Sequence, residues 1–396
     1  MKERPRAKQS DATLCIHAGE DRHGQRVSLT TDISQTSVFI FPRLNDLRLY
    51  STGKKPGYAY SRYANPTITV AEKKIAALEG AEACVVTASG MAAETILLLT
   101  LLRAGDEVAS MLDVYGGTTR LFEEVLAKFD VKTRFVPYRD LGRIERYFTR
   151  KTRVLFLETP TNPTLRCADI AELSRKARKR GITVVVDNTF ATPILQKPLE
   201  LGADVVVHSA TKYLGGHSDL TAGAIVGPLK VVEPARTVML QSGGNLDPGA
   251  SYLLIRGLKT LQIRVERACS NAAQIAAALC ANPKVLRVMY PGLPGNEGHD
   301  IARRQMSDYG MMVSFDVNGG ERSAERFIDA LRLWYLAPSL GGVESTVSYP
   351  LLSSHYGQPE PRLKLLDVSP ATIRLSVGIE DPEDLIEDLT QALAKA

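Results

Sequence analysis

Residues 182–213 read ITVVVDNTFATPILQKPLELGADVVVHSATKY and contain two short apolar runs, each followed at once by polar residues. The runs, at 182–186 and 205–207, are apolar or β-branched throughout instead of alternating between apolar and polar. Such runs are typical of strands that helices cover on both faces of a mostly parallel sheet. Similar runs stand at 84–88 and 154–157, with helix-like segments between them. The pattern therefore predicts a doubly wound α/β domain.

The segments between the runs carry helix-start signals. Asn65-Pro66 is a typical beginning of a helix, with the proline at its first position. Ser89, directly after the run at 84–88, is a candidate cap for a second helix. These starts support alternation of strands and helices.

The flanking segments differ in character. Residues 1–62 are irregular and polar, and we expect an N-terminal arm that reaches a neighbouring subunit. The large α/β domain is expected at 63–257. At 258–396 we expect a smaller α+β domain, with a strand near 311–317 and a last helix from Asp381-Pro382.

Composition excludes several classes of protein. The chain has 396 residues, of which 44% are hydrophobic and 23% charged, so it is neither disordered nor collagen-like. A net charge of +5 is too small to indicate a polyanionic partner, and the basic run at 175–180 suits a helix C-terminus, so no nucleic acid is expected. The longest near-continuous apolar run, 96–102, is too short to span a membrane.

Two further features concern location and metals. The charged start at 1–10 lacks the apolar core of a secretory signal. Five cysteines, odd in number and without a C-x-x-C motif, predict reduced residues of a cytoplasmic protein. No spacing of His, Cys, Asp and Glu predicts a metal site.

Polar residues follow each of the four predicted strands. In open parallel sheets, ligands bind beyond the carboxyl ends of the strands. The candidate segments there are Ser89-Gly90-Met91, 158–163, Asp187-Asn188-Thr189 and 208–212. A carboxylate, hydroxyls, a backbone turn and a lysine are therefore expected at one edge of the sheet.

Lys212 and Asp187 indicate the chemistry. A lysine held beside a core strand has its pKa lowered toward a free amine, which can form a Schiff base with an aldehyde. A carboxylate after a buried strand needs a cationic partner, and a protonated pyridine nitrogen would serve; a helix cap is the alternative. Ser209 and Thr211 could both point at a phosphate, and Gly90 could let a phosphate approach the backbone or simply fit a tight turn.

The segment 209–213, followed by Gly216-His217-Ser218-Asp219, resembles the lysine signature of the Cys/Met-metabolism family of pyridoxal-phosphate enzymes. That family includes cystathionine γ-synthases, cystathionine γ- and β-lyases, methionine γ-lyases and O-acylhomoserine sulfhydrylases. Further matching segments run in family order: 60–62, 65–67, 89–93, 115–118, 158–163, 187–189 and 374–378. The resemblance implies pyridoxal 5'-phosphate as cofactor, fold type I with an aspartate-aminotransferase-like large domain, and a cytoplasmic homotetramer built from two dimers.

The resemblance also implies residue roles. Lys212 would hold the cofactor and move protons, Asp187 would pair with its ring nitrogen, and Tyr115 would stack on the ring and help the leaving group depart. The phosphate would be held by Gly90, Met91, Ser209 and Thr211, with Tyr60 and Arg62 from the neighbouring subunit. The substrate carboxylate would be held by Asn162, Ser339 and Arg374.

Three positions bear on the reaction. Gly117 stands where methionine γ-lyases typically carry a cysteine, and Arg120 matches an arginine that cystathionine γ-lyases and γ-synthases use on the distal end of the substrate. Pro338 replaces a glutamate common in those two groups, which would suit the distal ammonium of cystathionine.

The expected reaction is γ-elimination from a γ-substituted L-amino acid such as cystathionine, methionine or homocysteine, giving a 2-oxo acid and ammonia. The alternatives are γ-replacement, as in a cystathionine γ-synthase or an O-acylhomoserine sulfhydrylase, β-elimination, and a non-catalytic homologue that still binds pyridoxal phosphate.

Overall fold

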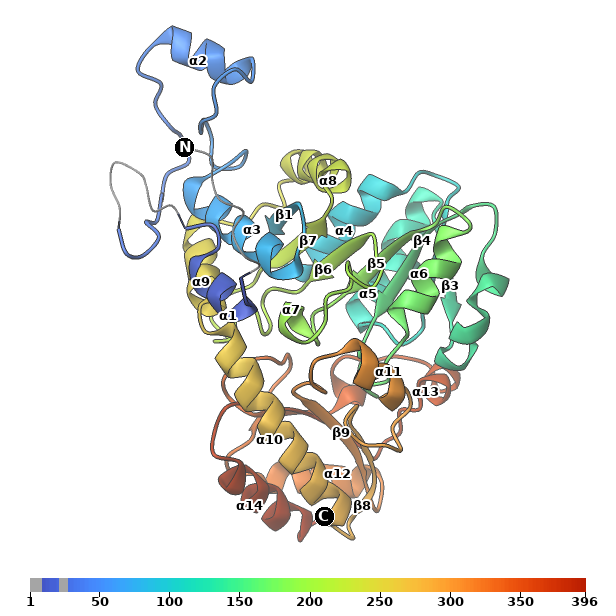
Figure 1. Cartoon of the computed structure of the whole chain (residues 1–396). Helices are drawn as coiled ribbons and strands as arrows, with labels where there is room; N and C mark the ends of the chain where they lie inside the picture. Colours follow the sequence, from blue (N-terminus) through green and yellow to red (C-terminus); the bar gives the residue numbers. More distant parts are fainter. Residues whose placement is uncertain (1–8, 21–27) are drawn as a thin grey trace.

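The computed structural model describes residues 9–20 and 28–396; residues 1–8 and 21–27 of the expected arm, and most of the charged start, lie outside the described residues. Two β-sheets organise the described chain, one of seven strands and one of five. The long helix α10 (Leu261–Ala281) runs from the large sheet to the small one (Figure 1). The predicted mixed α/β fold, with a large, mostly parallel sheet and a smaller second one, is confirmed.

The large sheet has the strand order β1-β7-β6-β5-β4-β2-β3. Its strands are β1 (Ala83–Thr87), β2 (Glu107–Met111), β3 (Lys132–Val136), β4 (Thr152–Glu158), β5 (Thr183–Asp187), β6 (Val205–His208) and β7 (Gly223–Gly227). Only β7 runs antiparallel to its neighbours, β1 and β6. The four apolar runs of the sequence correspond to β1, β4, β5 and β6, with ends that differ by at most about two residues.

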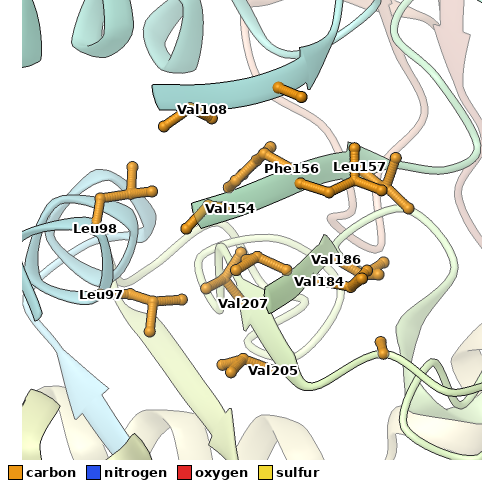
Figure 2. Close-up of a cluster of buried hydrophobic side chains, with 14 of the residues drawn as sticks. Leu97, Leu98, Val108, Val154, Phe156, Leu157, Val184, Val186, Val205 and Val207 are labelled. Atoms are coloured by element: carbon orange, nitrogen blue, oxygen red, sulfur yellow. The ribbon is translucent and has the colours of Figure 1, made fainter. Parts of the chain in front are cut away.

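Helices cover both faces of this sheet. They are α3 (Pro66–Glu79) and α9 (Pro248–Leu258) on one face, and α4 (Gly90–Leu101), α6 (Ile170–Arg178) and α8 (Leu229–Ser242) on the other. Strand β6 shows why its sequence is apolar throughout. Val205 and Val207 belong to the same cluster as Leu97 of α4 (Figure 2), whereas Val206 packs into the cluster on the opposite face.

The predicted helix caps are present. The side chain of Asn65 accepts a hydrogen bond from the N–H of Thr67 at 2.9 Å, and Ser89 accepts one from Ala92 at 3.1 Å. Because α4 begins directly after β1, this cap places the first turn of α4 at the carboxyl edge of the large sheet.

The smaller sheet has the order β10-β11-β12-β9-β8. Its strands are β8 (Val285–Met289), β9 (Met312–Val317), β10 (Tyr335–Leu336), β11 (Thr346–Ser348) and β12 (Thr372–Ser376). Helices α10, α12 (Glu321–Ala330) and α14 (Pro382–Leu393) enclose one apolar cluster with it. The expected strand near 311–317 and the last helix after Asp381 are thus confirmed.

Shorter elements connect these layers. They are α1 (Asp11–His17), α2 (Leu44–Ser51), α5 (Gly116–Arg120), η1 (Leu121–Val125), η2 (Leu126–Phe129), η3 (Tyr138–Tyr147), α7 (Thr192–Leu195), α11 (His299–Gln305), η4 (Pro350–Leu352) and α13 (Glu360–Leu366). The segment with α2 stands away from the rest of the chain (blue, top of Figure 1). It leaves apolar side chains in solvent, including Ile40 at 93% and Leu44 at 72% exposure.

Across residues 9–20 and 28–396, no helix has the length and apolar character needed to cross a membrane. The same residues contain no group of three or more His, Cys, Asp or Glu side chains placed to hold a metal ion. The five cysteines form no disulfide, and four of them are buried.

Candidate active site

A cavity of about 420 Å³ lies at the carboxyl edge of the large sheet. Its walls come from the segments after β1, β4, β5 and β6 and from the small domain. The predicted site residues among its lining are Gly90, Met91, Tyr115, Asn162, Asp187, Ser209, Thr211, Lys212, Ser339 and Arg374. The fold therefore brings together residues that lie far apart in the sequence.

Lys212 lies in the turn that follows β6. Burial and the charge of Arg374, against the opposing effect of Asp187, lower the pKa of its amine to about 8. Its Nζ donates a hydrogen bond to Ser339 Oγ from the small domain. The lysine amine is therefore available in its neutral, nucleophilic form near neutral pH.

Asp187 ends β5, the strand beside β6, and only 7% of its surface is exposed. Its Oδ1 accepts a hydrogen bond from the N–H of Thr189 at 2.9 Å, and no side chain of the described residues forms an ion pair with it. Burial raises the pKa of Asp187, against opposing effects from its bonds to Thr189 and the charges of His208 and Lys212. A buried carboxyl without a cation suits a ligand that brings one.

The start of α4 forms another wall of the cavity. The first N–H groups of a helix have no partner within the helix and form a site for anions. A Cβ built on Gly90 would lie 2.8 Å from Cβ of Ser209, so only glycine allows this close contact. The hydroxyl of Thr211 already bonds to the backbone of Ala222, accepting its N–H at 3.0 Å.

Arg374 of β12 closes the cavity from the small domain. Its Nη1 donates to Asn162 Oδ1 at 2.7 Å and its Nη2 to the carbonyl of Ser339 at 3.3 Å. Burial lowers the pKa of this guanidinium to about 10, and no carboxylate of the described residues forms an ion pair with it. Ser339 has φ 81°, a strained conformation for a residue other than glycine. The arrangement is suited to binding the carboxylate of a ligand.

Tyr115 precedes α5 and lies between the two domains. Its N–H donates to Glu158 Oε2 at 2.7 Å, which fixes its backbone to the end of β4. A Cβ built on Gly117 would lie 2.4 Å from Cε1 of the Tyr115 ring, so any larger residue there would displace the ring. Gly117 therefore allows the position that the Tyr115 ring occupies in this structure.

Three predicted site residues lie elsewhere in the single chain. Arg120 is exposed, and its Nη2 donates to the carbonyl of Tyr356 at 3.3 Å. Tyr60 and Arg62 also lie outside the cavity lining, and the guanidinium of Arg62 stands 4.8 Å above the ring of Tyr63. Their assigned roles stay predictions, and those of Tyr60 and Arg62 require a second subunit.

Sequence reasoning missed Glu94, which lines the cavity from α4 with only 4% of its surface exposed. The sequence pattern also gave no role to Glu158, although this residue begins the candidate segment 158–163. The available signal for Glu94 was its position as the only charged residue between Gly90 and Leu102, in a helix that is otherwise apolar.

A lysine amine, a buried carboxyl and a helix start around one cavity of an α/β fold are the groups that a pyridoxal-phosphate enzyme needs. The sequence profile of the family described as Cys/Met metabolism PLP-dependent enzyme matches residues 12–394, so the chain belongs to that family and the resemblance is confirmed.

Known relatives agree with this assignment. The chain is 43% identical over 388 residues to cystathionine gamma-synthase 1, chloroplastic, from Arabidopsis thaliana, covering 97% of this chain and 69% of that protein. It is 44% identical over 384 residues to an L-methionine gamma-lyase from Pseudomonas putida, covering 96% of each. The crystal structure of metB from Corynebacterium glutamicum superposes with a TM-score of 0.92 at 39% identity, covering 98% of both chains.

Proposed function

We propose that the protein binds pyridoxal 5'-phosphate in this cavity and catalyses γ-elimination from a γ-substituted L-amino acid such as methionine, cystathionine or homocysteine. The observation that carries the proposal is the pairing of Lys212, whose pKa is lowered to about 8, with Asp187, a buried carboxyl that lacks a cation, in one cavity. A protonated pyridine ring would supply that cation. When bound, the cofactor supplies an electron sink for cleavage of bonds beside the amino group.

The cavity residues fit the cofactor. Lys212 would hold it covalently, Asp187 would face its ring nitrogen, and Tyr115 would cover the ring. The phosphate would be held by Gly90, Met91, Ser209 and Thr211, with Tyr60 and Arg62 of a neighbouring subunit.

The remaining residues act on the substrate. Arg374 and Asn162 bind its carboxylate and so fix the direction of the Cα–H bond. The amine of Lys212 takes the proton from Cα, a second proton then leaves Cβ, and the hydroxyl of Tyr115 donates a proton to the departing γ-substituent. The products are the protonated leaving group, ammonia and a 2-oxo acid whose carbonyl oxygen comes from water.

Gamma-replacement is the second candidate, supported by the similarity to the Arabidopsis synthase. Both reactions begin with the same proton transfers. In replacement a thiol, such as that of a second amino acid, then adds at the γ position, whereas in elimination water releases the 2-oxo acid and ammonia. Pro338 lines the cavity where an acidic residue would attract a distal ammonium. Pro338 therefore disfavours cystathionine both as a substrate of elimination and as a product of replacement, and we place methionine and homocysteine, which lack the distal ammonium, first among the substrates.

The test measures 2-oxo acid release from methionine, homocysteine and cystathionine, with a Lys212→Ala variant as control. A parallel assay supplies an O-acylhomoserine with cysteine and measures cystathionine. Release from single amino acids supports elimination. Cystathionine formation without such release would transfer the assignment to replacement, and a loaded protein inactive in all assays would be non-catalytic.

We further propose a cytoplasmic homotetramer, with an arm at 1–62, a cofactor-binding domain at 63–257 and a small domain at 258–396. The exposed apolar side chains of the arm support burial against another subunit. The unpaired cysteines support a reducing compartment.

Two experiments test the proposed assembly. Light scattering should give the mass of four chains. Mixing the inactive variants Lys212→Ala and Arg62→Ala should restore activity if subunits share sites; a monomer would contradict the assembly.

A further inference from the structure

Glu94 is a buried acid that the roles above do not use. It lies in the second turn of α4 and lines the cavity, although only 4% of its surface is exposed. Its Oε1 accepts a hydrogen bond from Thr118 Oγ1 at 3.0 Å. Its Oε2 is buried and has no hydrogen-bond partner among the described residues.

Leaving a buried polar atom unpaired typically costs about 1–3 kcal/mol. Among residues 9–20 and 28–396 no group forms a hydrogen bond with Oε2, and Glu94 is the one charged residue of α4. A residue retained at such a cost inside a binding cavity is best explained by a partner that the ligand supplies.

The charges around the cavity determine the state of Glu94. Two acids act on it, Asp187 at the end of β5 and Glu158 at the end of β4. The cavity lining also contains the titratable side chains of Tyr115, Lys212 and Arg374, and His208 on β6 acts on Asp187. Burial raises the pKa of Glu94 well above its usual range, and the charge of Asp187 raises it further. Glu94 is therefore a neutral acid that still has one proton to donate.

We propose that Glu94 is a further cofactor-binding residue, which as a neutral acid donates a hydrogen bond to the bound cofactor and leaves Asp187 as the anion for its ring. The inference rests on the proposed function and assigns it one more residue. Two ionised carboxyls would surround one ring cation with excess negative charge, whereas one anion and one neutral donor balance it.

The test titrates cofactor-free protein with pyridoxal 5'-phosphate and follows the absorption of the bound form. Glu94→Gln keeps a neutral donor and an acceptor for Thr118, whereas Glu94→Leu keeps the size but removes both. We expect Glu94→Gln to bind as the unchanged protein does. Glu94→Leu should bind about five- to tenfold more weakly, as the loss of one neutral hydrogen bond predicts. Thr100→Val, at the far end of α4, serves as a matched control and should bind normally.

Two results would overturn the proposal. Unchanged affinity in Glu94→Leu would mean that the side chain only fills space, and equal weakening in both variants would mean that Glu94 acts as an anion. Thermal unfolding without cofactor checks the fold, because Glu94→Leu removes an unpaired acid but also leaves the buried hydroxyl of Thr118 without its acceptor.

A second readout does not depend on the leucine variant. The pH dependence of the bound absorption should be the same in Glu94→Gln as in the unchanged protein, because the proposal makes both side chains neutral. A shifted profile would contradict a neutral Glu94. If the unchanged protein binds no cofactor at all, the proposed function fails instead, so the two failures are distinguishable.

Discussion

The guanidinium of Arg374 donates a 2.7 Å hydrogen bond to Asn162 Oδ1, which joins β12 of the small domain to the loop after β4 of the large one. The same guanidinium contacts the carbonyl of Ser339, whose hydroxyl accepts from Lys212. A chain of three contacts therefore connects the carboxylate-binding side of the cavity to its lysine. A shift of Arg374 should therefore change the position of Lys212, and a shift of Lys212 should change that of Arg374.

Arg374→Lys should impair substrate binding more than cofactor binding. A lysine cannot keep both contacts of the fork and bind a carboxylate through two nitrogens. We expect kcat/KM to fall about 100-fold, equivalent to about 2.7 kcal/mol, mainly through KM. Steady-state kinetics and the cofactor absorption band check this, with Arg326→Lys on α12 as a control. A lost absorption band would show that Arg374 also holds the cofactor.

Covalent loading of cofactor-free protein should become faster with rising pH. The neutral amine of Lys212 is the reactive form, and its pKa lies at about 8 because of burial and Arg374. The rate should rise through pH 8 and level off above it, as measured by stopped-flow absorption. In Lys212→Ala, no cofactor should remain covalently attached to the protein after borohydride reduction. A rate independent of pH across this range would contradict the lowered pKa.

Asp187→Asn should weaken cofactor binding yet stabilise the cofactor-free protein. Burial raises the pKa of Asp187, so its ionised form is disfavoured in the folded state at high pH. The amide removes this cost, and the free energy of unfolding should rise by about 1 kcal/mol at pH 8, with a smaller gain in acid. Denaturant titration at two pH values measures it. Reduced stability at pH 8 would mean that the carboxylate is stabilised by contacts within the chain.

His355 should make the fold sensitive to acid. Burial and the charges of Arg374 and Arg362 lower its pKa to about 4, and its Nε2 is buried without a partner. Between pH 6.5 and 4, His355 is therefore protonated in the unfolded chain but neutral in the folded chain. The free energy of unfolding falls as the pH drops through this window.

The His355 contribution is on the order of 3 kcal/mol over the full window. His355→Gln should lose less stability than the unchanged protein between these pH values in matched denaturant titrations. Parallel curves for the two proteins would show that other groups cause any acid sensitivity.

Pro338→Glu should shift substrate preference toward cystathionine. Pro338 lines the cavity, and a carboxylate there would attract the distal ammonium that methionine lacks. The ratio of kcat/KM for cystathionine over methionine should rise by about tenfold, equivalent to about 1.4 kcal/mol. Pro338→Gln, which adds length without charge, is the control. An equal effect of both variants would point to shape instead of charge.

Several elements were predictable because their sequences carry a strong local signal. The runs at 84–88, 154–157, 182–186 and 205–207 are apolar throughout because both sheet faces are covered, so periodicity alone finds them. Strand β3 was not found, since it lies at the sheet edge with alternating exposed residues such as Lys132. Its stability comes from pairing with β2, which sequence patterns do not report.

The candidate site likewise contains some residues that the sequence pattern indicates and others that it does not. Lys212 follows one apolar strand and Asp187 ends another, so their positions indicated a Schiff-base lysine and a carboxylate for a cation, with a helix cap as the alternative for Asp187. Asn162, Ser339 and Arg374 meet only because the small domain folds over the cavity, and resemblance to a family was needed to connect them. Glu94 was missed since a lone charge in a helix normally faces water.

Asp187 ends β5 and Lys212 lies in the turn after β6, whereas Pro338 and Ser339 follow β10 and Arg374 lies on β12 of the smaller sheet. Pro338 takes no part in the chain of hydrogen bonds from Arg374 through Ser339 to Lys212, so a substitution there can alter which amino acid is accepted while those bonds are kept. Such a separation gives a ready route for duplicated genes to diverge into new metabolic roles while inheriting one set of proton-transfer groups.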